Sequence, residues 1–85
     1  MTDMAKTPEQ IRAILKQELG NIAPEAELDA LDPSADIREE LDIDSFDFVR
    51  YITAVCSALG GDVPELDYIE FSTLARAEQY LGKFF

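Results

Sequence analysis

One short stretch of this sequence places a hydroxyl group among carboxylates. The stretch is Asp42-Ile43-Asp44-Ser45-Phe46-Asp47, and it joins a loop-like region to an apolar helical segment. A serine in the first turn of a helix holds its oxygen beside unpaired backbone amides and the positive end of the helix dipole. A phosphate ester at this position would be favourably placed, and Ser45 is therefore the candidate modification site.

The acids around Ser45 allow other interpretations as well. Asp44 is placed to cap the following helix, and Asp47 lies near the helix N-terminus, where a carboxylate is stabilised by the dipole. Asp42-x-Asp44 also resembles the start of an EF-hand calcium loop, but that loop needs glycine and later glutamate where this chain has Asp47 and Thr53. We expect no metal site. On composition alone, Ser45 would be an ordinary polar residue of a first helical turn.

The composition excludes several classes of function. The 85 residues form one domain, residues 1–85, whose small core leaves little room for a catalytic cleft. The net charge of −11 would repel nucleic acid and anionic membranes, and it favours a partner with a basic patch. The chain has no histidine and one cysteine, Cys56, which excludes a disulfide framework, a zinc site and a histidine-based triad. These features predict a carrier or binding module and no enzyme activity.

The sequence shows no sign of a membrane segment or a leader. No stretch approaches the roughly 18 apolar residues that a spanning helix needs, and the N-terminus has no apolar core region. We expect a cytoplasmic monomer without membrane insertion, in which residues 1–6 are flexible. Cys56 is expected to pack as a small buried residue at the edge of the core.

Capping signals and hydrophobic spacing predict four helices. The first begins at about Pro8, after the cap Thr7, and stops at Gly20-Asn21. The central helix covers Ser45 to Leu59 and ends at Gly60-Gly61. A short third helical turn lies within Pro64 to Ile69 and carries Leu66 and Ile69; Ser72 or Thr73 caps a last helix carrying Leu74, Ala77 and Leu81. The predicted fold class is all-α, a small four-helix bundle with a long loop between helices one and two and a short third helix.

The long loop and the central helix both have a predicted core side. The loop from Gly20 to Asp44 is unusually long, and regularly spaced apolar residues are expected to pin it to the core: Leu28, Leu31, Ile37, Leu41 and Ile43. On the central helix one face gathers Phe48, Ile52, Val55 and Leu59, flanked by Val49, Tyr51 and Cys56. Phe46 lies on the opposite side and is the apolar residue out of place.

The residues from Leu31 to Ser45, Leu-Asp-Pro-Ser-Ala-Asp-Ile-Arg-Glu-Glu-Leu-Asp-Ile-Asp-Ser, resemble the approach to the modification site of acyl carrier proteins. Asp44-Ser45 matches the invariant pair of that family. The resemblance continues through the apolar positions of the central helix and its Gly-Gly stop to Phe71-Ser72-Thr73-Leu74 and Tyr80-Leu81. It therefore covers almost the whole chain.

The resemblance implies a specific function. Ser45 would carry a covalent 4'-phosphopantetheine arm, added from coenzyme A by a magnesium-dependent phosphopantetheinyl transferase. The thiol of the arm would hold acyl groups as thioesters for the acyl-loading and acyl-transfer enzymes of fatty-acid, polyketide or related biosynthesis. Asp44 would be the acidic residue beside the serine, with a role in capping, in orienting the metal of the transferase, or in both.

The chain also departs from the family pattern. Many members have glycine where this chain has Asp42 and leucine where it has Phe46, and the exposed side of their central helix is rich in Glu where this chain has Arg50, Cys56 and Ser57. A positive Arg50 should weaken docking to generic partners and favour particular ones. These departures predict a specialised carrier. Bulky residues also stand where the family commonly keeps an aliphatic acyl pocket: Phe48, Tyr51, Tyr68 and Phe71.

Partner binding is assigned to the residues near Ser45. Phe46 is interpreted as an exposed anchor for a partner pocket, beside Asp47 and Arg50. The remaining acids, Glu39, Glu40, Asp42 and Asp44, either steer a basic partner or form a solvated face. Two alternatives stay open: a peptidyl or aminoacyl carrier, and an unmodified acidic helical adaptor that binds a basic protein partner.

Overall fold

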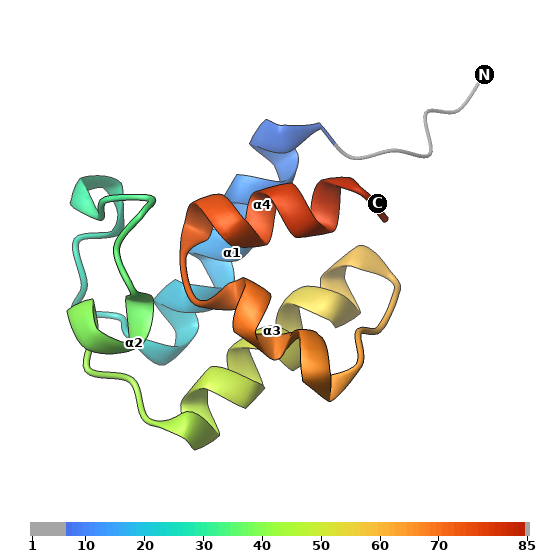
Figure 1. Cartoon of the computed structure of the whole chain (residues 1–85). Coiled ribbons are helices and arrows are strands. Elements are labelled where there is room, and N and C mark those ends of the chain that lie inside the picture. Colours follow the sequence, from blue (N-terminus) through green and yellow to red (C-terminus); the bar gives the residue numbers. More distant parts are fainter. Residues whose placement is uncertain (1–6, 85) are drawn as a thin grey trace.

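The computed structural model describes residues 7–84 of the chain (Figure 1). Its elements are, in order, α1 (Pro8–Ile22), the 3-10 helix η1 (Leu28–Ala30), α2 (Ile37–Glu40), α3 (Ser45–Leu59), the 3-10 helix η2 (Glu65–Phe71) and α4 (Leu74–Gly82). Residues 7–84 contain no strand, and the predicted all-α bundle is confirmed. The expectation of a flexible segment at residues 1–6 lies outside the described residues.

Helix α1 begins where the sequence predicts it and ends later. The Thr7 hydroxyl accepts a hydrogen bond from the Gln10 amide at 3.1 Å, and the Gln10 side chain accepts one from the Thr7 amide at 2.9 Å. This is a complete capping box. The predicted stop at Gly20-Asn21 is wrong, because the helix continues to Ile22, which packs against the core.

Helix α3 has the predicted bounds, Ser45–Leu59. Its end is a Schellman motif: Gly60 has a φ of 79°, its amide donates to the Ser57 carbonyl at 3.2 Å, and the Gly61 amide donates to the Cys56 carbonyl at 3.0 Å. Glycine adopts this left-handed conformation without a steric cost. A local signal in the sequence is therefore enough to end the helix here.

The third helical segment extends further than the predicted Pro64 to Ile69, and its apolar residues lie on two different edges. It forms the 3-10 helix η2, in which Leu66 is 89% exposed and Ile69 is 59% exposed, so these two residues do not face the core. In a 3-10 helix residues three apart lie on the same edge. Leu66 and Ile69 share one edge, while Tyr68 and Phe71 share another and face the core.

Helix α4 is capped by Thr73, whose hydroxyl accepts a hydrogen bond from the Arg76 amide at 3.0 Å. The three apolar residues predicted for this helix are buried: Leu74, Ala77 and Leu81.

None of the helices described is long and apolar enough to cross a membrane.

The long segment between α1 and α3 is pinned to the body of the protein, as predicted. Ile37 and Ile43 are buried, and the other expected anchors, Leu28, Leu31 and Leu41, are partly buried against the core. Two backbone bonds tie the segment to the start of α4: the Ile37 amide donates to the Ser72 carbonyl and the Ala75 amide donates to the Pro33 carbonyl, both at 2.9 Å. The segment is nevertheless not all loop, because it contains η1 and α2.

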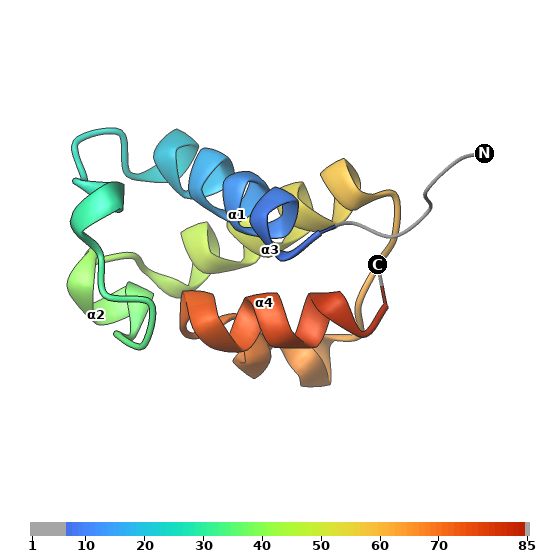
Figure 2. The ribbon, with the colours of Figure 1, turned by 90° about the horizontal axis from the view of Figure 1, so that it is seen from above.

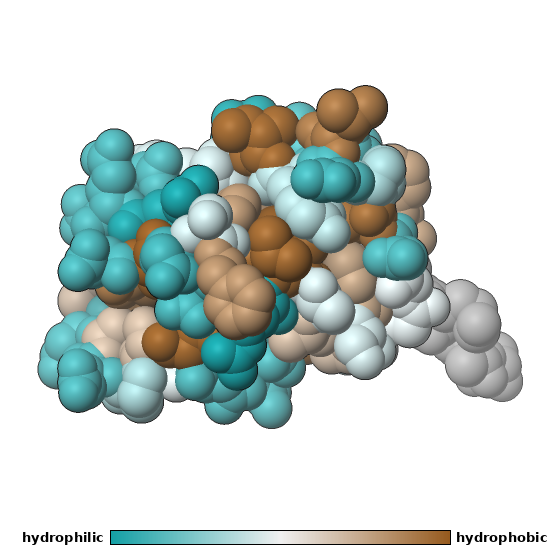
Figure 3. Space-filling model, turned by 90° about the horizontal axis from the view of Figure 1, so that it is seen from below, coloured by the Kyte–Doolittle hydropathy of each residue, from teal (hydrophilic) through white to brown (hydrophobic). Residues whose placement is uncertain are grey.

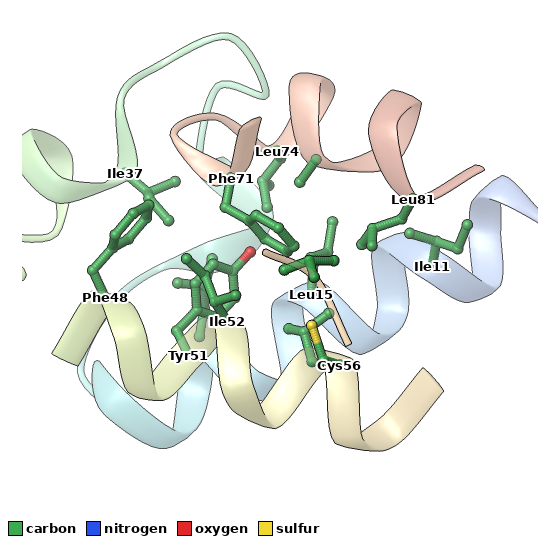
Figure 4. Packing of buried hydrophobic residues seen from close by; sticks show 14 of the residues in the cluster. Ile11, Leu15, Ile37, Phe48, Tyr51, Ile52, Cys56, Phe71, Leu74 and Leu81 are labelled. Atoms are coloured by element: carbon green, nitrogen blue, oxygen red, sulfur yellow. The ribbon is translucent and has the colours of Figure 1, made fainter. Parts of the chain in front are cut away.

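The core lies between three helices. α1 packs against both α3 and α4, and the segment with η1 and α2 covers the end of the bundle that lies away from the end of α4 (Figures 1 and 2). Aromatic rings continue through this core from Phe48 to Tyr51 and Phe71, with ring centroids 6.4 and 6.3 Å apart (Figure 4). The Tyr80 ring follows, with its centroid 6.0 Å from that of Phe71.

Two details of the predicted faces of α3 need correction. Cys56 is only 3% exposed, which confirms its expected packing but removes it from the exposed side that was also assigned to it. Leu59, expected on the core face, is only partly buried. Burial raises the pKa of the Cys56 thiol, and the nearby Asp62 carboxylate raises it further. A thiol with a raised pKa is a poor nucleophile.

Candidate functional site at the start of helix α3

Ser45 is the first residue of α3, and its side chain is exposed. The preceding residue, Asp44, has extended backbone angles and caps the helix: its carboxylate accepts a hydrogen bond from the Asp47 amide at 2.8 Å. The first amides of a helix have no partner within the helix, and here the cap occupies that of Asp47. The amides of Ser45 and Phe46 donate no hydrogen bond to the described residues, so they remain available beside the serine oxygen.

The residues before Ser45 hold it in place through a tight helix end. Asp36 caps α2, and its carboxylate accepts from the Arg38 amide at 2.9 Å. Six residues after Asp36 the chain reverses: Asp42 has a φ of 54°, and the Ile43 amide donates to the Arg38 carbonyl at 3.0 Å. This bond has the spacing of a Schellman motif, with Asp42 at the left-handed position. The position where the resemblance expects glycine is therefore the position whose backbone favours glycine.

Buried residues on both sides of Ser45 fix the direction of the exposed turn. Ile43 is 7% exposed and lies two residues before the serine. Phe48 is also 7% exposed and lies three residues after it, with the Arg38 guanidinium 5.4 Å from its ring centroid. The exposed serine therefore stands on a rigid support, held by the core on either side of it.

The residues assigned to partner binding surround Ser45 in the sequence and reach solvent. Phe46 is 72% exposed, as its place on the helical wheel indicated. Four of the acids are exposed: Glu39, Glu40, Asp42 and Asp44. Asp47 differs, because it is half-buried and its carboxylate lies 3.5 Å from the Arg50 guanidinium. The Asp47 and Arg50 charges therefore compensate each other.

A groove lies on the α1 side of the same helix. It has a volume of about 540 Å³ and is lined by residues of α1 and α3, among them Ile22, Val49 and Ala54. Val49 is 40% exposed and follows Ser45 by one helical turn. Sequence reasoning placed Val49 at the edge of the core; its spacing of four residues from Ser45 was the available signal for a surface position beside the site.

A second feature missed by sequence reasoning is the exposed apolar edge of η2, formed by Leu66 and Ile69. Both α3 and η2 contribute to the face that is turned downward in Figure 1. Figure 3 shows this face, where hydrophobic side chains emerge between hydrophilic ones. The spacing of Leu66 and Ile69 fits a 3-10 edge as well as an α-helical stripe, so the sequence alone could not assign their direction.

The surroundings of the Ser45 hydroxyl are favourable for a covalent phosphate ester. The hydroxyl is exposed, stands at the positive end of a fifteen-residue helix and has two free amides beside it. Within residues 7–84 no group of three or more histidine, cysteine or acidic side chains is placed to hold a metal ion. No histidine exists in the chain to activate the hydroxyl.

The comparison with protein families agrees with this geometry. The family described as phosphopantetheine attachment site matches residues 9–81, which is nearly the whole described chain. No curated protein and no solved structure matches the chain significantly.

Proposed function

This chain belongs to the phosphopantetheine attachment family, and we propose that Ser45 is the residue that carries its cofactor. The family fixes the cofactor as covalently attached 4'-phosphopantetheine and makes the protein a carrier. The observation that supports Ser45 is its position, exposed at the start of the helix that follows a capping aspartate. The thiol of the bound arm supplies the thioester chemistry, so the protein itself holds and presents the cargo.

The other serines fit the role less well. Ser34 donates a hydrogen bond to the Asp32 carboxylate at 2.9 Å, and Ser72 is half-buried. Ser57 is exposed but lies in the last turn of α3, beside the negative end of the helix dipole. A phosphate ester is favoured only at the opposite end, where Ser45 lies.

The attachment step follows from the environment of Ser45. The serine oxygen forms a bond to the phosphorus of the pantetheine half of coenzyme A while the pyrophosphate bond breaks. The adenosine-bisphosphate half leaves with the electron pair, and the hydroxyl proton passes to a base of the transferase. Asp44 positions the serine by capping the helix, and the free amides beside it face the new ester.

The proposed partner surface consists of Phe46, Asp47, Arg50 and the acids Glu39, Glu40 and Asp42. Phe46 supports this role because an aromatic side chain that is 72% exposed offers a partner pocket a large apolar area. The acids steer basic partners toward it, namely the transferase and the enzymes that load and receive the acyl group. The ion pair between Asp47 and Arg50 reduces the negative charge next to Phe46 and distinguishes this surface from an evenly acidic one.

The experiment that tests the proposal is modification by a phosphopantetheinyl transferase with coenzyme A and magnesium. Intact mass spectrometry should show the gain of one phosphopantetheine group on the wild-type protein. Ser45→Ala should show no gain, because the only proposed nucleophile is missing. Ser57→Ala is the matched control, an exposed serine of the same helix, and it should be modified like the wild type.

Two results would contradict the proposal. An unchanged wild-type mass would favour the unmodified adaptor, and an equal gain in Ser45→Ala would move the attachment site elsewhere. Each variant should first show wild-type helicity by circular dichroism, so that a missing gain reports the lost hydroxyl and not unfolding. Mass analysis of the protein from its native host separates the adaptor from the carrier independently.

The cargo that we propose is an acyl group of fatty-acid, polyketide or related biosynthesis, carried by a specialised, cytoplasmic and monomeric protein. The high acidity of the chain supports acyl over aminoacyl cargo. Identification of the thioester on the native protein by mass spectrometry tests this: an α-amino acid on the arm would establish the peptidyl or aminoacyl alternative.

A further inference from the structure

The core of this small bundle contains a polar group without a partner. Tyr51 of α3 is 1% exposed, and its hydroxyl has no hydrogen-bond partner among the described residues. Figure 4 shows the Tyr51 oxygen among the apolar side chains of the core, on the side of the ring of Phe71. It is the only buried side-chain nitrogen or oxygen in residues 7–84 that lacks a partner.

Tyr80, which lies in the same series of aromatic rings, shows how such a group is normally accommodated. The Tyr80 hydroxyl donates a hydrogen bond to the Asp67 carboxylate at 2.6 Å. Burying a hydroxyl without a partner is unfavourable, since the bond to water is lost and nothing replaces it. Phenylalanine would fill the position of Tyr51 with the same ring and without this cost. Packing of the ring therefore does not explain why this position has a tyrosine hydroxyl.

The surroundings of Tyr51 leave its hydroxyl as a neutral donor. Burial raises the pKa of Tyr51 well above its ordinary value, so the proton stays on the oxygen. The neighbouring rings, Phe48 at 6.4 Å and Phe71 at 6.3 Å between centroids, offer no strong acceptor. A ligand that brought a carbonyl or hydroxyl oxygen into this region would complete the missing bond.

The hydroxyl also lies within reach of the proposed attachment site. Tyr51 follows Ser45 by six residues, which corresponds to about 9 Å along the helix axis. The outer wall of this part of the core includes η2, whose start has no side-chain cap and whose one fully buried residue is Phe71. A short 3-10 helix has weaker hydrogen bonds than an α-helix and is more easily displaced. An acyl group on the thiol of the arm would therefore reach the Tyr51 hydroxyl by displacing η2 from α3.

We propose that the Tyr51 hydroxyl binds an oxygen on the acyl cargo, so that the protein prefers chains that carry a keto or hydroxyl group over fully saturated chains. This inference rests on the proposed function, because it needs a cargo tethered at Ser45. Tyr51 would act as a specificity-determining residue: its hydroxyl donates a hydrogen bond to the cargo oxygen, and no covalent bond changes.

The first part of the test uses the protein without cofactor and two matched variants. Tyr51→Phe should raise the melting temperature by about 4 °C or more, since it removes a buried hydroxyl without a partner. Tyr80→Phe should lower it, because that hydroxyl has a partner in Asp67. A lower melting temperature for Tyr51→Phe would show that the hydroxyl is already satisfied, for instance by an internal water, and would overturn the proposal.

The second part loads the three proteins through the transferase with octanoyl, 3-oxooctanoyl and 7-oxooctanoyl coenzyme A. In the wild type, one of the two oxo chains should raise the melting temperature by about 4 °C more than octanoyl does. The difference should vanish in Tyr51→Phe and persist in Tyr80→Phe. Melting by circular dichroism measures the stability of each loaded protein without a partner enzyme, and the comparison with Tyr51→Phe assigns the difference to the hydroxyl.

The outcomes separate this inference from the proposed function. If no arm is added to Ser45, the proposed function fails before cargo is compared. If the arm and the acyl groups are added but the oxo chains give no extra stabilisation, or give it equally in Tyr51→Phe, only the present inference is wrong. An equal loss of stabilisation for octanoyl and oxo chains in Tyr51→Phe would place the contact on the thioester carbonyl and would also overturn the preference.

Discussion

Phe46 and Phe48 lie two residues apart in the first turns of α3, yet their surroundings are opposite. Phe46 is 72% exposed, whereas Phe48 is 7% exposed and lies between Arg38 and Tyr51. Two residues along a helix correspond to a rotation of about 200°, so one ring faces solvent when the other faces the core. The comparison separates residues that hold the site in place from residues that are free to meet a partner.

The largest expected effect concerns the buried ring. Phe48→Ala should lower the free energy of unfolding by about 3 kcal/mol, because it leaves a cavity beside Ile37 and Tyr51 in the core. Phe46→Ala is the matched control and should change it by less than about 0.5 kcal/mol, as for most exposed side chains. Urea denaturation measures both values. Equal losses in the two variants would remove the distinction between the two sides of the helix.

For modification and partner binding, we expect the exposed ring of Phe46 to matter although it contributes little to stability. Phe46→Ala should reduce the rate of modification by the transferase, or the binding of a partner enzyme, by about fivefold or more if Phe46 is an anchor worth over 1 kcal/mol. The fold should stay intact. Steady-state modification rates, measured by intact mass, provide the test, with Leu66→Ala as an exposed apolar control on η2. A rate equal to that of the wild type would leave Phe46 without a binding role.

Gly60 is exposed like Phe46, yet we expect its substitution to lower the stability of the protein. Its φ of 79° is unfavourable for any residue with a Cβ atom, and a Cβ added there would meet no atom within 4 Å. Gly60→Ala should therefore cost about 1 to 2 kcal/mol through the backbone alone. Denaturation measures the loss; a neutral result would show that the end of α3 can rearrange.

The smallest expected effect is a gain. Asp42 occupies the left-handed position at the end of α2 with a φ of 54°. Asp42→Gly should relieve the backbone strain but increase the entropy of the unfolded chain, so we expect a net stabilisation of about 0.5 kcal/mol. A clear destabilisation would mean that the Asp42 carboxylate makes a contact worth more than the strain that it introduces.

Local signals accounted for most of the elements and for the position of Ser45 at the start of α3. Thr7 with Gln10, Asp44 with Asp47, and Gly60 each act through bonds that span five residues or fewer. Such signals are complete within one segment and can be predicted without knowing the rest of the chain. The bounds of α3, the exposure of Phe46 and the position of Ser45 were predicted for this reason.

Contacts between distant segments accounted for the predictions that failed. Helix α2 has four residues, too few to be stable alone, and its first amide is satisfied by the Ser72 carbonyl far along the chain. The direction of η2 depends on Phe71 packing against Tyr51 and Tyr80. Nothing near Leu66 and Ile69 in the sequence indicates that Phe71 takes the place in the core.

The sequence by itself determined the helical class, the family and the serine at the start of α3, because helix periodicity, caps and the approach to Ser45 are all written within short segments. Only the tertiary structure decided which apolar residues are buried and which polar group is left without a partner. Burial depends on what the neighbouring elements cover, and Tyr51 is the result with the greatest consequence. From the sequence, Tyr51 is one of several aromatic residues at core positions. Only the packing of the neighbouring rings determines that its hydroxyl has no hydrogen-bond partner.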